Sequence, residues 1–428
     1  MYLGDGEMRV IKFVFEIFKA YPRFLLRMVL LMTITGTLST GSLLTIAPII
    51  DFYLHPDLVG ISPLTEEAIK VLEFFHLDVS LASWLAIFLS AIFLNSFFIV
   101  LLHHAVLLTK YAVLRDLLFG TLEDFFHAKW QFFSGHKQGT IMNTFLRELQ
   151  VVGNAFSAIA FSFSTLFQVA FYLAVPFYIS WKVTCLSIAI ASVFSLPFLW
   201  LGKLSYRFGT LNTETANVNS TTIQENFNLI KVILGFGNQQ ESIKNLNASY
   251  NAHYDATIKS QVLGMAIPAL YKPFGMAMVV ISLFTAQWAN VPLSETSVLL
   301  IVLLQACTQA GTFLQYKNSL DNFLPSYEHI KEFRRQAIQQ KQVSGGRNFT
   351  GFQDKIGLNG VTFSYAEGVP VLRDIHLNIE KGKMIALTGK SGSGKSTLID
   401  LIMGFHEPKN GSIEIDGVRL QEFDVYSY

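Results

Sequence analysis

The sequence predicts an all-α membrane domain with six spanning helices, followed by an incomplete α/β domain that carries a phosphate-binding loop. Hydrophobic residues make up 51% of the 428-residue chain and charged residues only 15%, whereas a soluble domain usually carries about 25% charged residues. The long apolar runs all precede Phe333, and ordinary soluble-type sequence follows it. A glycine-rich GxxxxGK[ST] pattern lies in this second part.

Six apolar runs are long enough to cross a bilayer, which takes about 20 residues. A shorter segment, Met8–Lys19, precedes them and carries charged residues at steps of three and four. Such an amphipathic helix lies in the membrane interface, and its charges argue against a secretory signal. The predicted spans are Phe24–Ile50, Leu81–Thr109, Val151–Ser180, Val183–Gly202, Val262–Ala289 and Leu293–Tyr316.

The connections between the spans alternate in charge. Asp51–Ser80 is acidic, whereas the long connections Lys110–Gln150 and Lys203–Gln261 are basic. The positive-inside rule therefore places these long connections and both termini in the cytoplasm. Apolar residues at helical steps indicate that the spans continue as helices beyond the membrane. We expect the two helical hairpins to turn at Gln131–Gly139 and Thr222–Phe236 and to dock on the domain that carries the phosphate loop.

The composition divides the chain into four parts, which are residues 1–23 (the interfacial helix), 24–335 (the membrane domain), 336–352 (a linker rich in Gln, Gly, Ser and Asn) and 353–428 (the soluble part). Within the soluble part, alternating apolar and polar residues predict strands, and glycines mark the turns. The expected strands are Ile356–Tyr365, Val371–Ile379, Met384–Leu387 and Gly411–Ile415, and the expected helix is Lys395–Gly404.

The GxxxxGK[ST] pattern runs from Gly389 to Ser396, between an expected strand and an expected helix, which is the context this motif requires. Glycines let the backbone bend around a phosphate chain, so that N–H groups and the helix N-terminus point at the anion. Lys395 supplies a positive charge for the outer phosphates, and the hydroxyl of Ser396 is placed to hold Mg²⁺. The candidate phosphate-binding residues are Gly389, Lys390, Ser391, Gly392, Ser393, Gly394, Lys395, Ser396 and Thr397.

This order of parts resembles the ATP-binding cassette (ABC) exporters that are built as half-transporters. The resemblance implies a six-helix exporter domain followed by a P-loop nucleotide-binding domain, ATP and Mg²⁺ as cofactors, and a second half-transporter as partner, forming a homodimer. Val361–Tyr365 is similar to the family's first strand, which implies that Tyr365 stacks on adenine. Phe132–Gly139 and Gln224–Phe236 are similar to the two segments that couple the spans to the nucleotide-binding domains.

Within the family, several details resemble the lipid-linked oligosaccharide flippases and neighbouring lipid or glycan exporters. These are Leu398–Gly411, Ala47-Pro48 and the external segment Glu66–Phe75. The resemblance implies ATP-driven flipping or export of a lipid-linked glycan or another lipid amphiphile across a bacterial inner membrane. A peptide or hydrophobic small-molecule exporter is the alternative, and an ATP-gated channel or a non-transporting regulator on the same fold is an alternative of a different class.

The family's glutamine loop, signature motif, catalytic glutamate and switch histidine are expected after Tyr428. We therefore interpret the sequence as the N-terminal portion of a longer protein. The resemblance implies an ABC-type ATPase for the full-length protein and no ATP hydrolysis by these residues alone.

A few other residues allow two interpretations. His103 and His104 lie in the second span, where they either serve a proton or substrate or form neutral hydrogen bonds within the bundle. Arg27 either extends to the inner headgroups or holds a phosphorylated lipid. Cys185 and Cys307 lie in apolar runs and are interpreted as buried hydrophobes, not as disulfide partners or metal ligands. The formal charge of +1 argues against a nucleic-acid partner.

Overall fold

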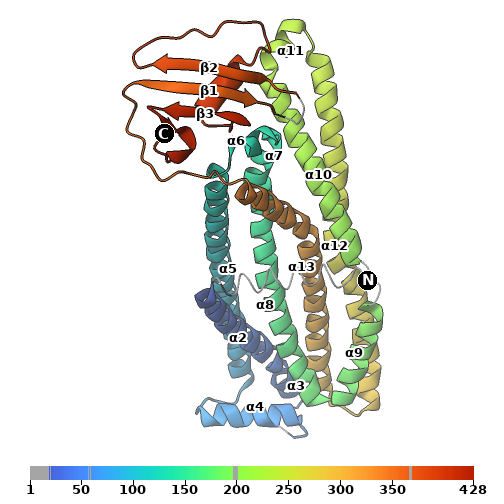
Figure 1. Ribbon diagram of the computed structural model, residues 1–428. Coiled ribbons are helices and arrows are strands. Elements are labelled where there is room, and N and C mark those ends of the chain that lie inside the picture. The colour runs from blue at the N-terminus through green and yellow to red at the C-terminus, as the bar shows by residue number, and fades with distance from the viewer. Residues whose placement is uncertain (1–18, 20, 56, 58, 196–200, 366–368) are drawn as a thin grey trace. The chain divides into compact units, whose positions relative to one another are not determined.

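The computed structural model describes the chain apart from residues 1–18, 20, 56, 58, 196–200 and 366–368 (Figure 1). The predicted interfacial helix, Met8–Lys19, lies almost wholly outside the described residues. The chain forms two compact units, one made of residues 1–118 and 142–330, the other of residues 119–141 and 331–428. The first predicted coupling segment therefore belongs to the same unit as the soluble part.

The first unit is built from long helices that run side by side (Figure 1). In its long apolar stretches, apolar side chains occupy most faces of the helix, as expected for helices in a membrane. In chain order the helices are α2 (Pro22–Leu44), α3 (Ile46–Leu54), α4 (Pro63–Phe74), α5 (Leu81–Phe126), the π-helical turn η1 (Thr144–Glu148), α8 (Leu149–Ile179), α9 (Trp181–Ser195), α10 (Leu201–Asn228), α11 (Ile230–Phe236), α12 (Gln239–Trp288) and α13 (Leu293–Gln339).

Among the described residues, five helical stretches are long and apolar enough to cross a membrane. They are Pro22–Leu54, Leu81–Phe126, Gln138–Ile179, Gln239–Trp288 and Leu293–Gln339, and they match five of the six predicted spans to within one residue at either end or extend beyond them. The remaining predicted span, 183–202, overlaps α9 and reaches residues outside the described part of the chain. A sixth span therefore stays a prediction.

The predicted helical extensions are present. Helix α5 continues to Phe126, α10 runs to Asn228, and α12 starts at Gln239. Side chains of the extensions and of α8 form a shared core around Phe156, Ile159 and Ile330, all of which are at most 2% exposed. This packing keeps α8 and α13 together where they leave the predicted spans.

The second unit contains a four-stranded antiparallel sheet with the order β2-β1-β3-β4. Its elements are β1 (Lys355–Phe363), β2 (Leu372–Glu380), helix α14 (Lys395–Ile402), β3 (Asn410–Ile415), β4 (Val418–Arg419) and the 3₁₀ turn η3 (Leu420–Glu422). In β1, Leu358 pairs with Leu377 of β2 on one side and with Ile413 of β3 on the other. Leu398 and Leu401 of α14 pack into the same core, which fixes the helix that follows the phosphate loop.

The predictions for this part are confirmed for the three strands that became β1, β2 and β3 and for the helix that starts at Lys395. The predicted strand at residues 384–387 is wrong, because these residues form no regular structure and Met384 is 99% exposed. A strand needs a neighbour for its backbone hydrogen bonds. Within the described residues, no strand pairs with this segment.

The end of α13 is joined to the segment around helices α6 (Trp130–Ser134) and α7 (Gln138–Asn143) within the second unit. The helix extends to Gln339, into the first residues of the predicted linker. Beyond it, Lys129 N donates to Gln340 O at 2.7 Å and Gln342 N donates to His127 O at 2.8 Å. Phe125, Phe132 and Phe333 pack with ring centroids 5.0–5.3 Å apart.

Candidate functional site

The phosphate loop connects the exposed segment after β2 to the N-terminus of α14. Gly394 caps this helix with a positive φ of 88°, which favours glycine. A Cβ atom at this position would lie 2.8 Å from Leu372 Cδ2, so the site has no room for a side chain. The sheet core and the conformation of Gly394 thus hold the loop at the positive end of the helix dipole, where an anion is stabilised.

The polar groups of the loop fit the phosphates of a nucleoside triphosphate. The Lys395 ammonium donates to Gly389 O at 2.9 Å and to Lys390 O at 2.8 Å, so its charge already lies inside the loop. Ser396 is exposed at the first turn of α14. A lysine charge, glycine backbone N–H groups and an adjacent hydroxyl are the donor set that binds phosphates with Mg²⁺.

Tyr365 lies beside the loop although 32 residues separate it from Thr397. Its hydroxyl is 3.0 Å from the hydroxyl of buried Thr397, in the first turn of α14. Phe363 contacts the tyrosine ring edge-on, at 5.0 Å between ring centroids. The side chain remains 61% exposed. A ring that is held at its edge and exposed elsewhere suits stacking on a base.

His406 is a neighbour of this site that the sequence did not single out. It is 7% exposed and packs against the rings of Phe363 and Tyr365, with centroids 5.1 and 5.3 Å away. Burial lowers the pKa of His406, and the charge of Asp400 opposes this shift. Within the described part of the chain, its Nδ1 atom has no hydrogen-bond partner. His406 therefore supports Tyr365 as a neutral ring.

A second feature missed from the sequence joins the two residues just before the predicted first coupling segment to the residues that follow α14. Trp130 stacks on Phe405, and the Lys129 ammonium lies 3.0 Å from Glu407 Oε1. Phe405, His406 and Glu407 lie three to five residues after the end of α14. The pattern Phe-His-Glu-Pro carries no local sign of these contacts, because their partners lie far away in the sequence.

The other residues singled out in the sequence lie in the first unit. His103 Nδ1 is 3.0 Å from Ile99 O, and its ring packs 4.9 Å from Phe161. This geometry favours the interpretation as a hydrogen-bonded histidine. His104 and Arg27 are exposed on their helices. Both cysteines are free, and Cys185 is exposed, so its interpretation as a buried residue within this chain is wrong. An apolar side chain on a spanning helix can face lipid instead of protein.

The sequence of the membrane unit matches a family model, that of the ABC transporter transmembrane region, over residues 25–308. This match covers more than half of the chain. The chain belongs to the ABC transporters. The family's ATP-binding model, described as ABC transporter, matches residues 372–427, which include the phosphate loop and α14.

Several curated ABC proteins are similar to this chain. The heterocyst differentiation ATP-binding protein HepA of Nostoc sp. is 29% identical over 299 residues, which are 69% of this chain and 49% of HepA. The ATP-dependent lipid A-core flippase of Saccharophagus degradans is 26% identical, over 65% of this chain and 47% of the flippase. The flippase of Desulfotalea psychrophila is 22% identical, over 74% and 56%. The chain spans about half the length of these relatives.

The fold is also found in a solved structure, that of a bacterial Atm1-family ABC exporter with ATP bound. The two align with a TM-score of 0.71 at 14% sequence identity, over 95% of this chain and 70% of the exporter. The ABC exporter architecture, with a helical membrane part and a partial nucleotide-binding domain, is therefore shared. Long apolar helices and the exporter relatives identify the chain as an integral membrane protein.

Proposed function

We propose that the full-length protein uses ATP to flip or export a lipid-linked glycan or another lipid amphiphile across a bacterial inner membrane. The observation that carries this proposal is the combination of a phosphate loop and spanning helices in one chain. Helix α13 runs without interruption from the last predicted span to Gln339, shortly before the ATP-binding part begins. The lipid A-core flippases among the relatives support a lipid amphiphile as substrate.

In this proposal, residues 389–397 bind the phosphates of ATP, Ser396 holds Mg²⁺ and Tyr365 stacks on adenine. The Lys395 ammonium, now bound to two loop carbonyls, transfers its hydrogen bonds to the outer phosphates. Bound Mg²⁺ neutralises developing negative charge during phosphoryl transfer. The catalytic glutamate and the signature motif are expected from the part of the full-length protein beyond Tyr428.

An apolar cavity in the membrane unit supports a substrate with hydrocarbon chains. It measures about 300 Å³ and lies between α8, α9, α12 and α13, with Leu173, Ile188, Phe274, Met278 and Leu303 among its lining side chains. A cavity of this size and lining suits an apolar group. A peptide or hydrophobic small-molecule substrate is the alternative within the same family.

A second copy of the chain is the partner in this proposal. None of the residues of α11, in the second coupling segment, is buried within the chain. Ile230, Val232, Leu234 and Phe236 are 47–85% exposed. Apolar side chains that gather on a surface mark an interaction site. ATP bound between two copies favours the closed arrangement, and closure shifts the spans from inward- to outward-facing.

The orientation of the chain in the membrane is proposed from the positive-inside rule. The basic helix extensions and both termini then lie in the cytoplasm. Proteoliposomes that contain the full-length protein and a fluorescent lipid test the proposal directly. We expect ATP to move the labelled lipid between the leaflets, and ADP to leave it in place. A passive ion conductance opened by ATP, without lipid movement, would instead identify a channel.

A further inference from the structure

Beyond the predicted spans, the helices of the first unit form two groups. Side chains of α5, α8 and α13 share an apolar core, with Val113, Ile159 and Ile330 among its members. Within the part of the chain that the structure describes, no hydrophobic side chain of α10 or α12 belongs to this core or packs against it. Helices α10 and α12 instead pack along each other and carry the second predicted coupling segment, 222–236, at their turn. We call α10 and α12 the hairpin, and α5, α8 and α13 the core bundle.

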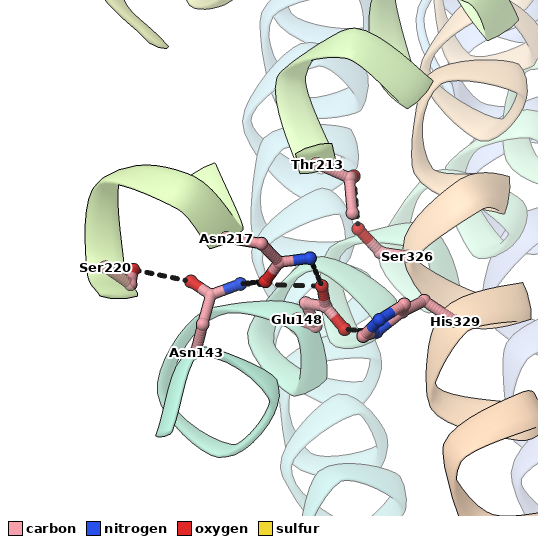
Figure 2. Close-up of polar contacts among 7 residues, drawn as sticks. All are labelled: Asn143, Glu148, Thr213, Asn217, Ser220, Ser326 and His329. Atoms are coloured by element: carbon pink, nitrogen blue, oxygen red, sulfur yellow. Dashed lines mark hydrogen bonds and ion pairs between the residues drawn. The ribbon is translucent and has the colours of Figure 1, made fainter. Parts of the chain in front are cut away.

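Hydrogen bonds between polar side chains join the hairpin to the core bundle (Figure 2). Asn143, which directly precedes η1, donates from Nδ2 to Oδ1 of Asn217 in α10 at 2.6 Å. The Ser220 hydroxyl donates to Asn143 Oδ1 at 3.2 Å. The hydroxyls of Thr213 and Ser326 lie 3.1 Å apart. We call this contact the polar seam; its residues are Ser205, Thr213, Asn217, Ser220 and Ser260 in the hairpin and Asn143, Glu148, Asn318, Asn322 and Ser326 on the side of the core bundle.

Glu148 has its closest partner within the core bundle. Its side chain is 0% exposed, and His329 of α13 donates from Nδ1 to Glu148 Oε2 at 2.6 Å. Asn217 of the hairpin donates to Glu148 Oε1 over a longer distance, 3.4 Å. A short hydrogen bond to a carboxylate is the stronger of the two, and a buried charge is strongly destabilised when it loses its partner. If Asn217 moves away, His329 still pairs with the buried carboxylate.

The hydrogen bonds of the seam are incomplete on the side of α13. Ser205 donates to the backbone carbonyl of Asn318 at 2.8 Å, and Asn322 donates from Nδ2 to the Ser260 hydroxyl at 2.6 Å. The side-chain oxygens of Asn318 and Asn322 are buried and accept no hydrogen bond from any described residue. A buried acceptor without a donor costs the hydration that it has lost. Opening of the seam restores this hydration, which reduces the free energy that favours the closed arrangement.

Within the predicted spans, by contrast, α12 and α13 are joined by apolar side chains. Met278 of α12 packs with Leu299 and Leu303 of α13, and all three are at most 4% exposed. Apolar contacts are costly to expose to water, whereas a neutral hydrogen bond contributes little net free energy because water can replace either partner. The hairpin is therefore held firmly at the spans and can separate from the core bundle at the seam.

We propose that the polar seam opens and closes in each transport cycle, and that its amide and hydroxyl side chains hold the hairpin when the seam is closed and bind water when it is open. This proposal rests on the proposed ATP-driven transport. The seam side chains are positioning residues, because they act through the hairpin that carries the second predicted coupling segment. An apolar seam of the same shape would stabilise the closed arrangement and slow its opening.

A disulfide across the seam tests the proposal in the full-length protein in lipid nanodiscs. All native cysteines, including Cys185 and Cys307, are first replaced by serine. Thr213→Cys with Ser326→Cys then places a pair across the seam, where the two native hydroxyls are 3.1 Å apart. We expect oxidation to lower kcat for ATP about tenfold or more, as for lost coupling between sites, and reduction to restore it.

The matched control is a disulfide within the hairpin. Asn212 Oδ1 and Thr257 Oγ1 lie 2.9 Å apart between α10 and α12, so Asn212→Cys with Thr257→Cys joins the same helix α10 to its partner in the hairpin. Because this cross-link does not span the seam, we expect kcat for ATP to be the same before and after oxidation.

A second variant does not depend on disulfide formation. Thr213→Val with Ser326→Ala keeps the shape of the seam and removes both partners of one hydrogen bond, which is nearly neutral or stabilising. We expect an equal or higher Tm and a several-fold lower kcat for ATP, while KM for ATP stays within about twofold because the phosphate loop is intact. Thr257→Val, which removes a hydrogen bond inside the hairpin, should retain the kcat of the unsubstituted protein.

Recovery of turnover after reduction shows that the loss comes from the cross-link and not from misfolding. Undiminished turnover with the seam cross-linked, or an equal loss with the hairpin cross-linked, overturns the proposal. A normal kcat in Thr213→Val with Ser326→Ala also overturns it. Failure of the proposed function is recognised separately, as absence of ATP turnover in the unsubstituted protein.

Discussion

Trp130 stacks on Phe405 with ring centroids 5.5 Å apart and an interplanar angle of 27°. Phe405 lies three residues after α14, the helix that starts at the phosphate loop. The contact thus joins the residues that follow α14 to the residue just before the first predicted coupling segment, 131–139. Lys129 and Glu407 add an ion pair next to it.

Replacing Trp130 with alanine should weaken coupling between ATP turnover and transport. An aromatic pair contributes about 0.5–1.5 kcal/mol beyond its buried area, which predicts a several-fold lower number of lipids moved per ATP hydrolysed. Trp130→Phe retains an aromatic contact and serves as the control. The ratio is measured in proteoliposomes, and an unchanged ratio in Trp130→Ala would show that the stack does not transmit motion.

Gly394→Ala should impair nucleotide binding more than Gly392→Ala. Both glycines have positive φ, 88° and 81°, and a left-handed conformation costs an alanine about 1–2 kcal/mol. At Gly394 the new Cβ also meets Leu372 at 2.8 Å, whereas at Gly392 it meets nothing within 4 Å. Titration of the full-length variants with a fluorescent ATP analogue measures the difference. The opposite ranking would contradict the described loop geometry.

Substitutions of Tyr365 separate its ring from its hydroxyl. Tyr365→Ala removes base stacking, which contributes about 1–3 kcal/mol, so the Kd for ATP should rise about tenfold or more. Tyr365→Phe loses the hydrogen bond to Thr397, which contributes about 1 kcal/mol, and should raise the Kd less. Tyr365→Trp should bind nearly normally. Equal affinities of the three variants for ATP would show that Tyr365 does not stack on adenine.

His406 should make the ATP-binding part less stable in mild acid. Its pKa is lowered by burial, so the unfolded state binds its proton more readily. The stability is fully present above the unfolded pKa of about 6.5 and is lost as pH falls from there toward the lower folded pKa. Thermal unfolding of the full-length protein between about pH 7.5 and 5.5 should show a smaller decrease of Tm in His406→Phe.

The exposed His376 is the control for this experiment. His376→Gln is measured alongside His406→Phe, to show the effect of removing a histidine from the surface. If Tm falls equally with pH in His406→Phe and in the unsubstituted protein, the buried ring does not titrate in this range.

The sequence predicted those features that depend on local patterns. Alternating side chains identified β1 and β2, and glycine spacing identified the loop and the start of α14. The strand predicted at 384–387 failed because a strand depends on a neighbour that no local pattern reveals. The extent of α13 was underestimated, since its charged and glutamine-rich end resembles a linker as much as a helix.

Contacts between distant residues were beyond sequence reasoning. Glu148 follows Arg147 in a polar stretch that suggests a solvated helix face, and nothing nearby indicates that it is fully buried. Its partners Asn217 and His329 are 69 and 181 residues away. Trp130 and Phe405 are similarly separate, so only the folded chain reveals either junction.

The central claim is that the loop at residues 389–397 drives an ATP-dependent transporter, and the most direct test is ATP turnover by Lys395→Ala in the complete protein. The matched control is Lys383→Ala, which removes an exposed lysine outside the loop. We predict that Lys395→Ala abolishes ATP turnover and lipid movement while the membrane unit keeps its thermal stability, and that Lys383→Ala retains both activities. Undiminished turnover in Lys395→Ala would contradict the account.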